Sequence, residues 1–182
     1  MKHSLRKIAV SLASLAAAVT MLTSALPSAN AAAFSQDPGI TARAHVQNVG
    51  WMPYKSAAAT SGVTVGTTGQ SLRMEYVNLR IDKIPPSMGG VRIRSHVADI
   101  GWLNAAEAPC GTMLGTGTTG QGKAIEAMSI QLVGPIANYF NIEYNLHVQD
   151  IGWQGIHRNG AVAGTTGQGK RTEALFVRLR HR

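Results

Sequence analysis

Three kinds of side chain that could do chemistry recur along this sequence at matching places: tryptophan, histidine and glutamate. The tryptophans are 51 residues apart and close the phrases HVQNVGW, HVADIGW and HVQDIGW, which end at Trp51, Trp102 and Trp153. An exposed indole can stack on the apolar face of a sugar ring and gives a large contact area at small entropic cost. The alternative is that each tryptophan packs into the core beside its glycine, and the phrase alone leaves both interpretations open.

The histidines of the same phrase, His45, His96 and His147, suggest two further interpretations. An assembly with threefold symmetry could gather them around its axis as a zinc-type site with one open position. No carboxylate recurs beside them in the sequence, however. We therefore favour structural histidines, hydrogen-bonded to the backbone or to the recurring glutamate, and expect no metal ion or other cofactor.

The recurring glutamates are Glu75, Glu126 and Glu173, each at the head of an alternating apolar stretch. A carboxylate at the edge of an apolar face is costly to bury unless it receives hydrogen bonds. We expect the neighbouring Gly-Thr-Thr-Gly-Gln turn to supply them, which makes these glutamates structural. Glycoside hydrolysis needs two carboxyl groups in one cleft, and one glutamate per repeat does not provide a pair, so we predict no enzymatic activity.

The Gly-Thr-Thr-Gly-Gln turn lacks the Lys-Ser/Thr ending and the following helix of a phosphate-binding loop. Its hydroxyl and carboxamide groups suit sugar hydroxyls. With the tryptophan, they predict one shallow polar site in each repeat, and three such sites on a rigid body would gain affinity for a repeating polymer. The candidate polar ligand-binding residues are Thr68, Thr119, Thr166, Gln70, Gln121 and Gln168.

The elements that must position these residues are strands, because the segment after each turn alternates with period two. The repeats span about 40–81, 91–132 and 141–179, each with three or four short strands, and Pro-containing joints connect them. A unit of this length cannot bury its own apolar face. We predict a single all-β domain over 32–182, with three units around a pseudo-threefold axis as a β-prism or, alternatively, a β-trefoil.

Residues 1–31 have the pattern of a secretory signal peptide, with a basic start, an apolar run and the Ala29-Asn30-Ala31 cleavage site. Their removal takes away three of the 17 basic and none of the nine acidic residues, so the net charge falls from +8 to +5. No later stretch is long and apolar enough for a transmembrane anchor. The single Cys110 cannot form an internal disulfide, and we interpret it as a small loop residue instead of a reactive thiol.

The HVQxIGW phrase, followed by GTTGQ, a basic pair and Glu, resembles the clostridial hydrophobic tryptophan repeat, the ChW repeat. Three copies cover nearly all of the chain after the signal peptide. The resemblance implies an exported bacterial protein whose repeats serve surface adhesion or bind polysaccharides and other macromolecules. Repeat two departs from the pattern at Ala98, where the other repeats have glutamine, and at Ala124, where a basic residue is expected.

These observations predict a secreted or cell-surface binding module that is not an enzyme and whose ligand is a polysaccharide or an anionic cell-surface polymer. The alternative is a protein-interaction or structural scaffold of an extracellular assembly. Nucleic acid is excluded as a partner because the sequence offers neither a recognition helix nor an aromatic stacking platform. The basic residues that cluster in repeat three fit an anionic polymer or a solvated face; they are Arg158, Lys170, Arg171, Arg178, Arg180 and Arg182.

Overall fold

The computed structural model describes residues 37–182, so the predicted signal peptide, 1–31, lies outside the described residues. Repeat one contains β1 (Gly39–Val46), β2 (Gly50–Trp51), β3 (Lys55–Ala58), β4 (Val63–Gly66) and β5 (Met74–Asp82). Repeat two contains β6 (Gly90–Val97), β7 (Gly101–Trp102), β8 (Ala106–Pro109), β9 (Leu114–Gly117) and β10 (Ile125–Val133). Repeat three contains β11 (Phe140–Val148), β12 (Gly152–Trp153), β13 (His157–Arg158), β14 (Ala163–Gly164) and β15 (Thr172–His181).

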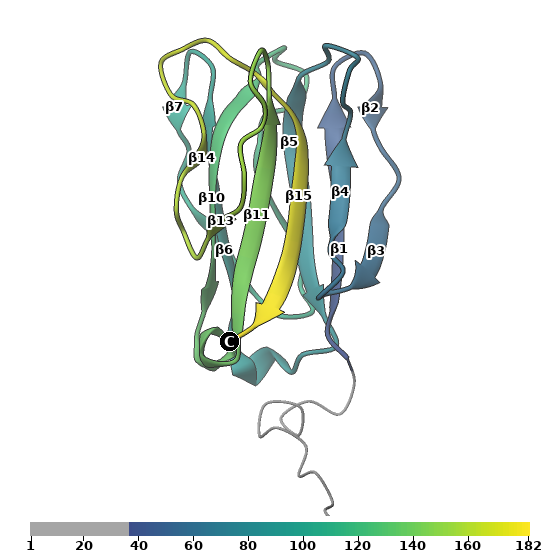
Figure 1. Cartoon of the computed structure of the whole chain (residues 1–182), viewed down its shortest axis with the longest axis vertical. Coiled ribbons are helices and arrows are strands. Elements are labelled where there is room, and N and C mark those ends of the chain that lie inside the picture. Colours follow the sequence, from purple (N-terminus) through teal and green to yellow (C-terminus); the bar gives the residue numbers. More distant parts are fainter. Residues whose placement is uncertain (1–36) are drawn as a thin grey trace, which may run out of the picture.

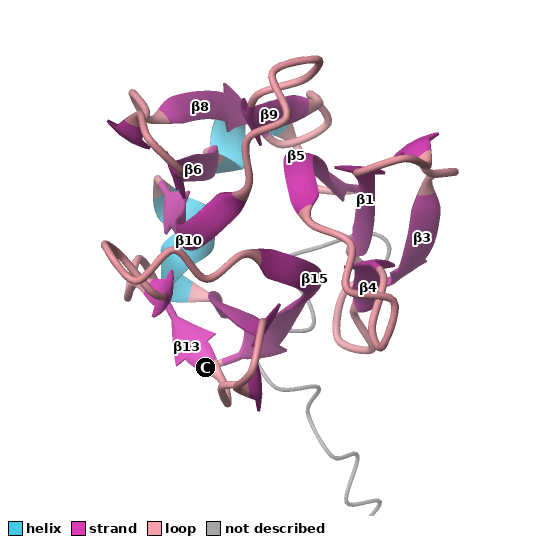
Figure 2. Cartoon of the chain, turned by 90° about the horizontal axis from the view of Figure 1, so that it is seen from above, coloured by secondary structure: helices cyan, strands magenta, loops and turns pink. Residues whose placement is uncertain are grey.

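The strands form three sheets, each built on one long antiparallel pair. We call them the first sheet (around β1 and β5), the second sheet (around β6 and β10) and the third sheet (around β11 and β15). Seen from above, the sheets surround a common centre (Figure 2). Strand alternation turns one face of each pair toward that centre, as for Ile40, Ala42 and Ala44 of β1, which are fully buried.

The inner faces of the sheets share a single hydrophobic core. Leu79, Ile130 and Tyr144, one from each repeat, belong to the same buried cluster. Burial of a large apolar side chain contributes about 1.5–3 kcal/mol, and no single sheet could bury these residues alone. The prediction of an all-β fold with three units in a prism-like arrangement is therefore confirmed, and the sheets do not close into the barrel of a trefoil.

Each sheet is completed by a strand from another repeat, which the sequence did not predict. Strand β9 of repeat two pairs with β5, β14 of repeat three pairs with β10, and β4 of repeat one pairs with β15. The exchange is cyclic, and it places β4 of repeat one beside β15 of repeat three although the whole of repeat two separates them in the sequence (Figure 1). Backbone pairing thereby joins the first repeat to the last. It also covers one edge of each long strand pair.

The joints between repeats are more than the surface connections that their prolines predict. Each contains a short 3-10 helix, η2 (Pro86–Met88) or η3 (Pro135–Asn138), that begins at a proline. Proline suits a first helical position because its backbone has no N–H to leave unpaired. Ile84 and Ile136, beside or within these turns, are buried against the core. The joints therefore contribute apolar side chains to the core.

Among the described residues, 37–182, no helix has the length and apolar character needed to cross a membrane.

Candidate functional site

A tight turn places each recurring tryptophan on the outer face of its sheet. In repeat one the turn is closed by a hydrogen bond from the Val49 N–H to the Val46 carbonyl (3.1 Å), and Asn48 has a φ of 61°. Asn and Asp tolerate this left-handed conformation better than other non-glycine residues, and Asp99 and Asp150 adopt it in the other repeats, at 60° and 62°. The chain then reverses into the Gly-Trp strand.

The tryptophans are exposed and do not pack into the core. The exposed fractions of Trp51, Trp102 and Trp153 are 42%, 36% and 42%. Each ring meets the recurring histidine of the neighbouring strand edge to face, with 5.3 Å between the ring centres of His45 and Trp51, 5.5 Å in repeat two and 5.4 Å in repeat three. One edge of each indole is thus fixed, while much of its surface faces solvent.

The recurring glutamates do not lie on the inner strand face, as their spacing suggested, because each occupies a β-bulge. Strand pairing matches His45 with Tyr76 and Val46 with Met74, so that Glu75 has no opposite residue. Glu126 and Glu173 likewise have no opposite residue in the pairing of their strands. A bulge re-aims a side chain, and here it turns the carboxylate toward the histidine on the outer side of the sheet.

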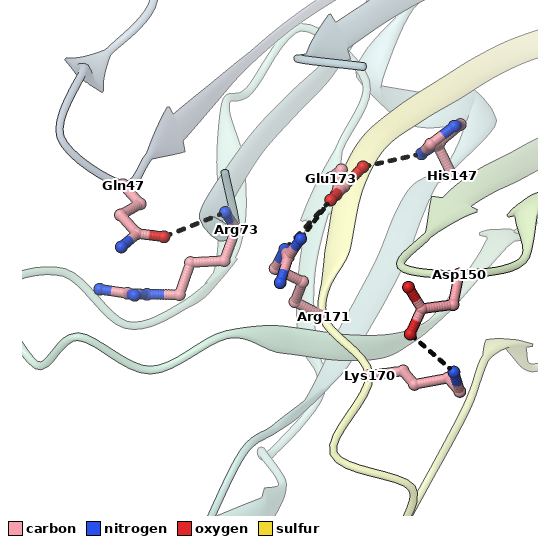
Figure 3. A network of polar contacts seen from close by, with 7 residues as sticks. All are labelled: Gln47, Arg73, His147, Asp150, Lys170, Arg171 and Glu173. Carbon is pink, nitrogen blue, oxygen red and sulfur yellow. Dashed lines mark hydrogen bonds and ion pairs between the residues drawn. The ribbon is translucent and has the colours of Figure 1, made fainter. Parts of the chain in front are cut away.

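The carboxylates are almost buried, and in repeats one and three each lies between a histidine and an arginine. The Oε2 atom of Glu75 is 3.0 Å from Nδ1 of His45, and its Oε1 atom accepts a 2.8 Å hydrogen bond from Nε of Arg73. Repeat three repeats this arrangement with Glu173, His147 and Arg171, drawn in Figure 3. The glutamate thus fixes the histidine that supports the tryptophan, which is a positioning role and not a paired-carboxylate active site.

Repeat two has only half of this network. His96 Nδ1 lies 3.0 Å from Glu126 Oε2, but Ala124 stands where the other repeats have arginine.

A separate ion pair joins the turn to the polar loop in repeats two and three, between Lys123 and Asp99 (3.0 Å) and between Lys170 and Asp150 (3.1 Å).

The Gly-Thr-Thr-Gly-Gln loops link one repeat to another through the backbone. The Thr67 N–H donates to the carbonyl of Glu173, Thr118 to Glu75, and Thr165 to Glu126. The turn therefore holds the backbone of a glutamate from a different repeat, whereas we had expected it to supply hydrogen bonds to the carboxylate of its own repeat.

The candidate polar residues of these loops are exposed at the end of the molecule that also carries the β1–β2 and β6–β7 turns, opposite the C terminus (Figure 1). Within residues 37–182, no hydrogen bond joins them to a tryptophan. The six residues are Thr68, Thr119, Thr166, Gln70, Gln121 and Gln168.

Arginine covers the ring face of two tryptophans. The guanidinium carbon of Arg43 lies 4.1 Å from the ring centre of Trp51 and 4.3 Å from that of Tyr54, so the cation stands between two aromatic rings. Arg94 lies 4.5 Å from the ring centre of Trp102. Such cation–π contacts stabilise by about 0.5–1 kcal/mol at exposed sites.

Repeat three has Asn145 at the corresponding place. Arg43, Arg94 and Asn145 each lie two residues before the recurring histidine on the outer face of the strand. That spacing is visible in the sequence and would have identified these three positions as part of the surface. Sequence reasoning missed them because arginine occupies this position in only two of the three repeats.

The histidines lie on three separate sheets and not around the central axis, so the geometry does not form a three-histidine centre. Among the described residues, no cluster of three His, Cys, Asp or Glu side chains could hold a metal ion.

The basic residues of repeat three are mostly paired within the protein. Arg158 and Arg178 both bind the buried carboxylate of Glu143 at 2.7–2.8 Å. Lys170 and Arg171 bind acidic residues of their own repeat. Four of the six basic residues that suggested an anionic partner are therefore ion-paired with three carboxylates of the protein, which weakens that part of the expectation.

The chain matches the family described as Clostridial hydrophobic W over residues 45–83, 96–134 and 147–181. It belongs to this family, and each matched segment begins at a recurring histidine, a few residues after the boundary that the strand pattern suggested. Neither a curated protein nor a solved structure matched the chain significantly.

Proposed function

We propose that this chain is an exported, non-enzymatic binding protein whose tryptophan surfaces bind a polysaccharide or a cell-surface polymer. The observation that carries the proposal is that three indoles, each 36–42% exposed, are fixed on the outer faces of one rigid core. A fixed aromatic ring loses little conformational entropy when it packs against a sugar ring.

The threefold arrangement favours a repeating ligand. One shallow aromatic surface binds weakly, but three on one body raise the effective concentration of each further contact, provided that the ligand spans them. The basic start and apolar run of residues 2–22 support export.

A protein partner is the second candidate, and one observation favours it. The residue two positions before each tryptophan is aliphatic and about half exposed: Val49 at 52%, Ile100 at 46% and Ile151 at 48%. Exposed apolar groups of this size beside an aromatic ring are typical of protein interaction surfaces. A scaffold function would use these residues as much as the tryptophans.

Retention on insoluble cellulose, chitin and isolated cell walls distinguishes the two candidates. The triple variant W51A/W102A/W153A should remain folded, because the rings are exposed, and should lose retention. The matched control is V49S/I100S/I151S, which removes the neighbouring apolar groups but leaves the stacking rings. Equal loss in both triple variants would indicate hydrophobic adsorption or protein binding, and full retention by the tryptophan variant would overturn the polymer proposal.

A further inference from the structure

The outer faces of the three sheets differ in what surrounds the tryptophan, although the backbone repeats. Exposure does not distinguish Trp51 from Trp153, since both are 42% exposed. The difference lies in which side chains face the rings.

The first tryptophan surface is already occupied by protein groups. Arg43 lies over Trp51, and its Nε donates a 3.1 Å hydrogen bond to the Asn78 side-chain oxygen. Tyr76 meets the same indole edge to face, with 5.5 Å between ring centres. A sugar that stacked on this ring would have to displace a guanidinium held by a hydrogen bond and two aromatic rings.

The second surface is also covered by a cation, since Arg94 lies over Trp102. The same arginine also lines a polar hollow, together with Arg92, Ser129 and Gln131. The ring of Trp102 is the least exposed of the three, at 36%.

On the third surface, no arginine of residues 37–182 lies over the tryptophan. A shallow hollow there is lined by Thr64, Asn145, Trp153 and Phe176. Thr64 reaches it from repeat one, because β4 pairs with β15 and places Thr64 opposite Phe176. The guanidinium carbon of Arg178 lies 5.8 Å from the ring centre of Phe176, and this arginine shares the Glu143 carboxylate with Arg158.

One polar atom at the third surface lacks a partner. The side-chain oxygen of Asn145 is buried and makes no hydrogen bond within residues 37–182. A buried carboxamide oxygen without a donor is costly, by about 1–3 kcal/mol. A hydroxyl group that entered the hollow, with a small rotation of the carboxamide, would supply the donor while an apolar ring face covered the indole.

We propose that the hollow formed by Trp153, Phe176, Asn145 and Thr64 is the primary sugar-binding site of this protein, and that it takes an uncharged pyranose unit. The proposal rests on the proposed function and deepens it. The sugar ring stacks on Trp153 and a hydroxyl donates to Asn145. An uncharged ligand is favoured because, among the described residues, no guanidinium stands over Trp153 as Arg43 and Arg94 stand over the other two rings. The site is composite, because repeat one contributes Thr64.

The test compares single variants of the full chain for retention on insoluble cellulose and chitin, two uncharged polymers. W153A should reduce retention roughly tenfold or more, whereas W51A and W102A should each reduce it less than about threefold. N145R introduces the arginine that the other two sheets carry and should reduce retention as W153A does. V162S, which removes an exposed apolar group in the loop just before β14, is the control expected to leave retention unchanged.

The outcomes separate the two proposals. If the wild-type protein is not retained on these polymers or on cell walls, the proposed function fails, and the assignment of the third surface fails with it. If the wild type is retained but the three tryptophan variants lose retention equally, the function stands and the assignment is wrong. Unaltered retention by folded N145R also overturns the assignment, and if N145R does not fold, the comparison of the three exposed tryptophans decides alone.

Discussion

The backbone N–H of Thr67 donates a 2.9 Å hydrogen bond to the carbonyl oxygen of Glu173, joining the first repeat to the last. The same bond recurs between Thr118 and Glu75 and between Thr165 and Glu126. With the exchanged strands, these contacts close the three repeats into a ring. The molecule should therefore unfold as one unit, because opening any joint exposes the shared core.

Gly66 should be essential to this closure. Its φ is 88°, and a Cβ atom there would overlap the Glu173 carbonyl oxygen and lie 2.8 Å from the Ala174 Cα. We expect Gly66→Ala to lower the free energy of unfolding by about 3 kcal/mol, from backbone strain and steric overlap together. Urea denaturation followed by circular dichroism measures this loss.

Gly69→Ala is the matched control for that experiment. Gly69 also has a left-handed φ, 71°, but no atom lies within 4 Å of an added Cβ. Its loss should be limited to the conformational cost of about 1 kcal/mol. Equal losses for the two variants would show that the contact with β15 does not govern stability.

Repeat two should gain stability from the arginine that it lacks. In repeats one and three the glutamate is paired with Arg73 or Arg171, whereas within the described part of the chain Glu126 is paired with His96 and with no arginine. We expect Ala124→Arg to raise the free energy of unfolding by about 0.5–1 kcal/mol, since the new pair is partly exposed. Ala124→Gln, without the charge, should give a smaller gain, and an equal gain would assign the effect to something other than the ion pair.

Glu143 should make the stability of the protein depend on pH. Burial of its carboxyl group raises the pKa, but hydrogen bonds and charges from Arg158 and Arg178 outweigh burial and hold the pKa below the ordinary value of 4.5. A carboxyl group with a lowered pKa in the folded state stabilises the protein above pH 4.5, and the contribution is lost as the pH falls through the folded-state pKa.

Glu143→Gln should therefore lower the free energy of unfolding by about 1 kcal/mol at pH 7, a modest figure because Arg158 is largely exposed. The difference from the wild type should shrink as the pH falls well below 4.5. Urea denaturation of both proteins across this range measures it, and a difference that stays constant with pH would contradict the assignment.

Cys110 should be unreactive in the folded protein. Its side chain is 1% exposed within the core, and burial raises the pKa of the thiol to about 11. Since the thiolate is the reactive form, a thiol reagent at pH 8 should label the native protein very slowly and the urea-unfolded protein at once. Rapid labelling of the native protein would mean that β8 and the following turn open readily.

The sequence by itself determined the repeat, the strands and the shared core. Alternation such as that of Val77, Leu79 and Ile81 is local, because successive side chains of a strand point to opposite faces. The period of 51 residues shows that three similar units must bury their apolar faces in the same way. Neither inference requires knowledge of which strand lies beside which.

The tertiary structure alone decided the strand exchange, the direction of the glutamates and the cover of each indole. The pairing between β4 and β15 is made by backbone N–H and C=O groups, which nearly every residue has. No pattern of side chains in the sequence therefore predicts it. The bulge at Glu75 is a property of two strands in register, and it reversed the face expected from alternation. Whether an indole is covered, as Trp51 is by Arg43, or left open, as Trp153 is beside Asn145, depends on neighbours that only folding brings together.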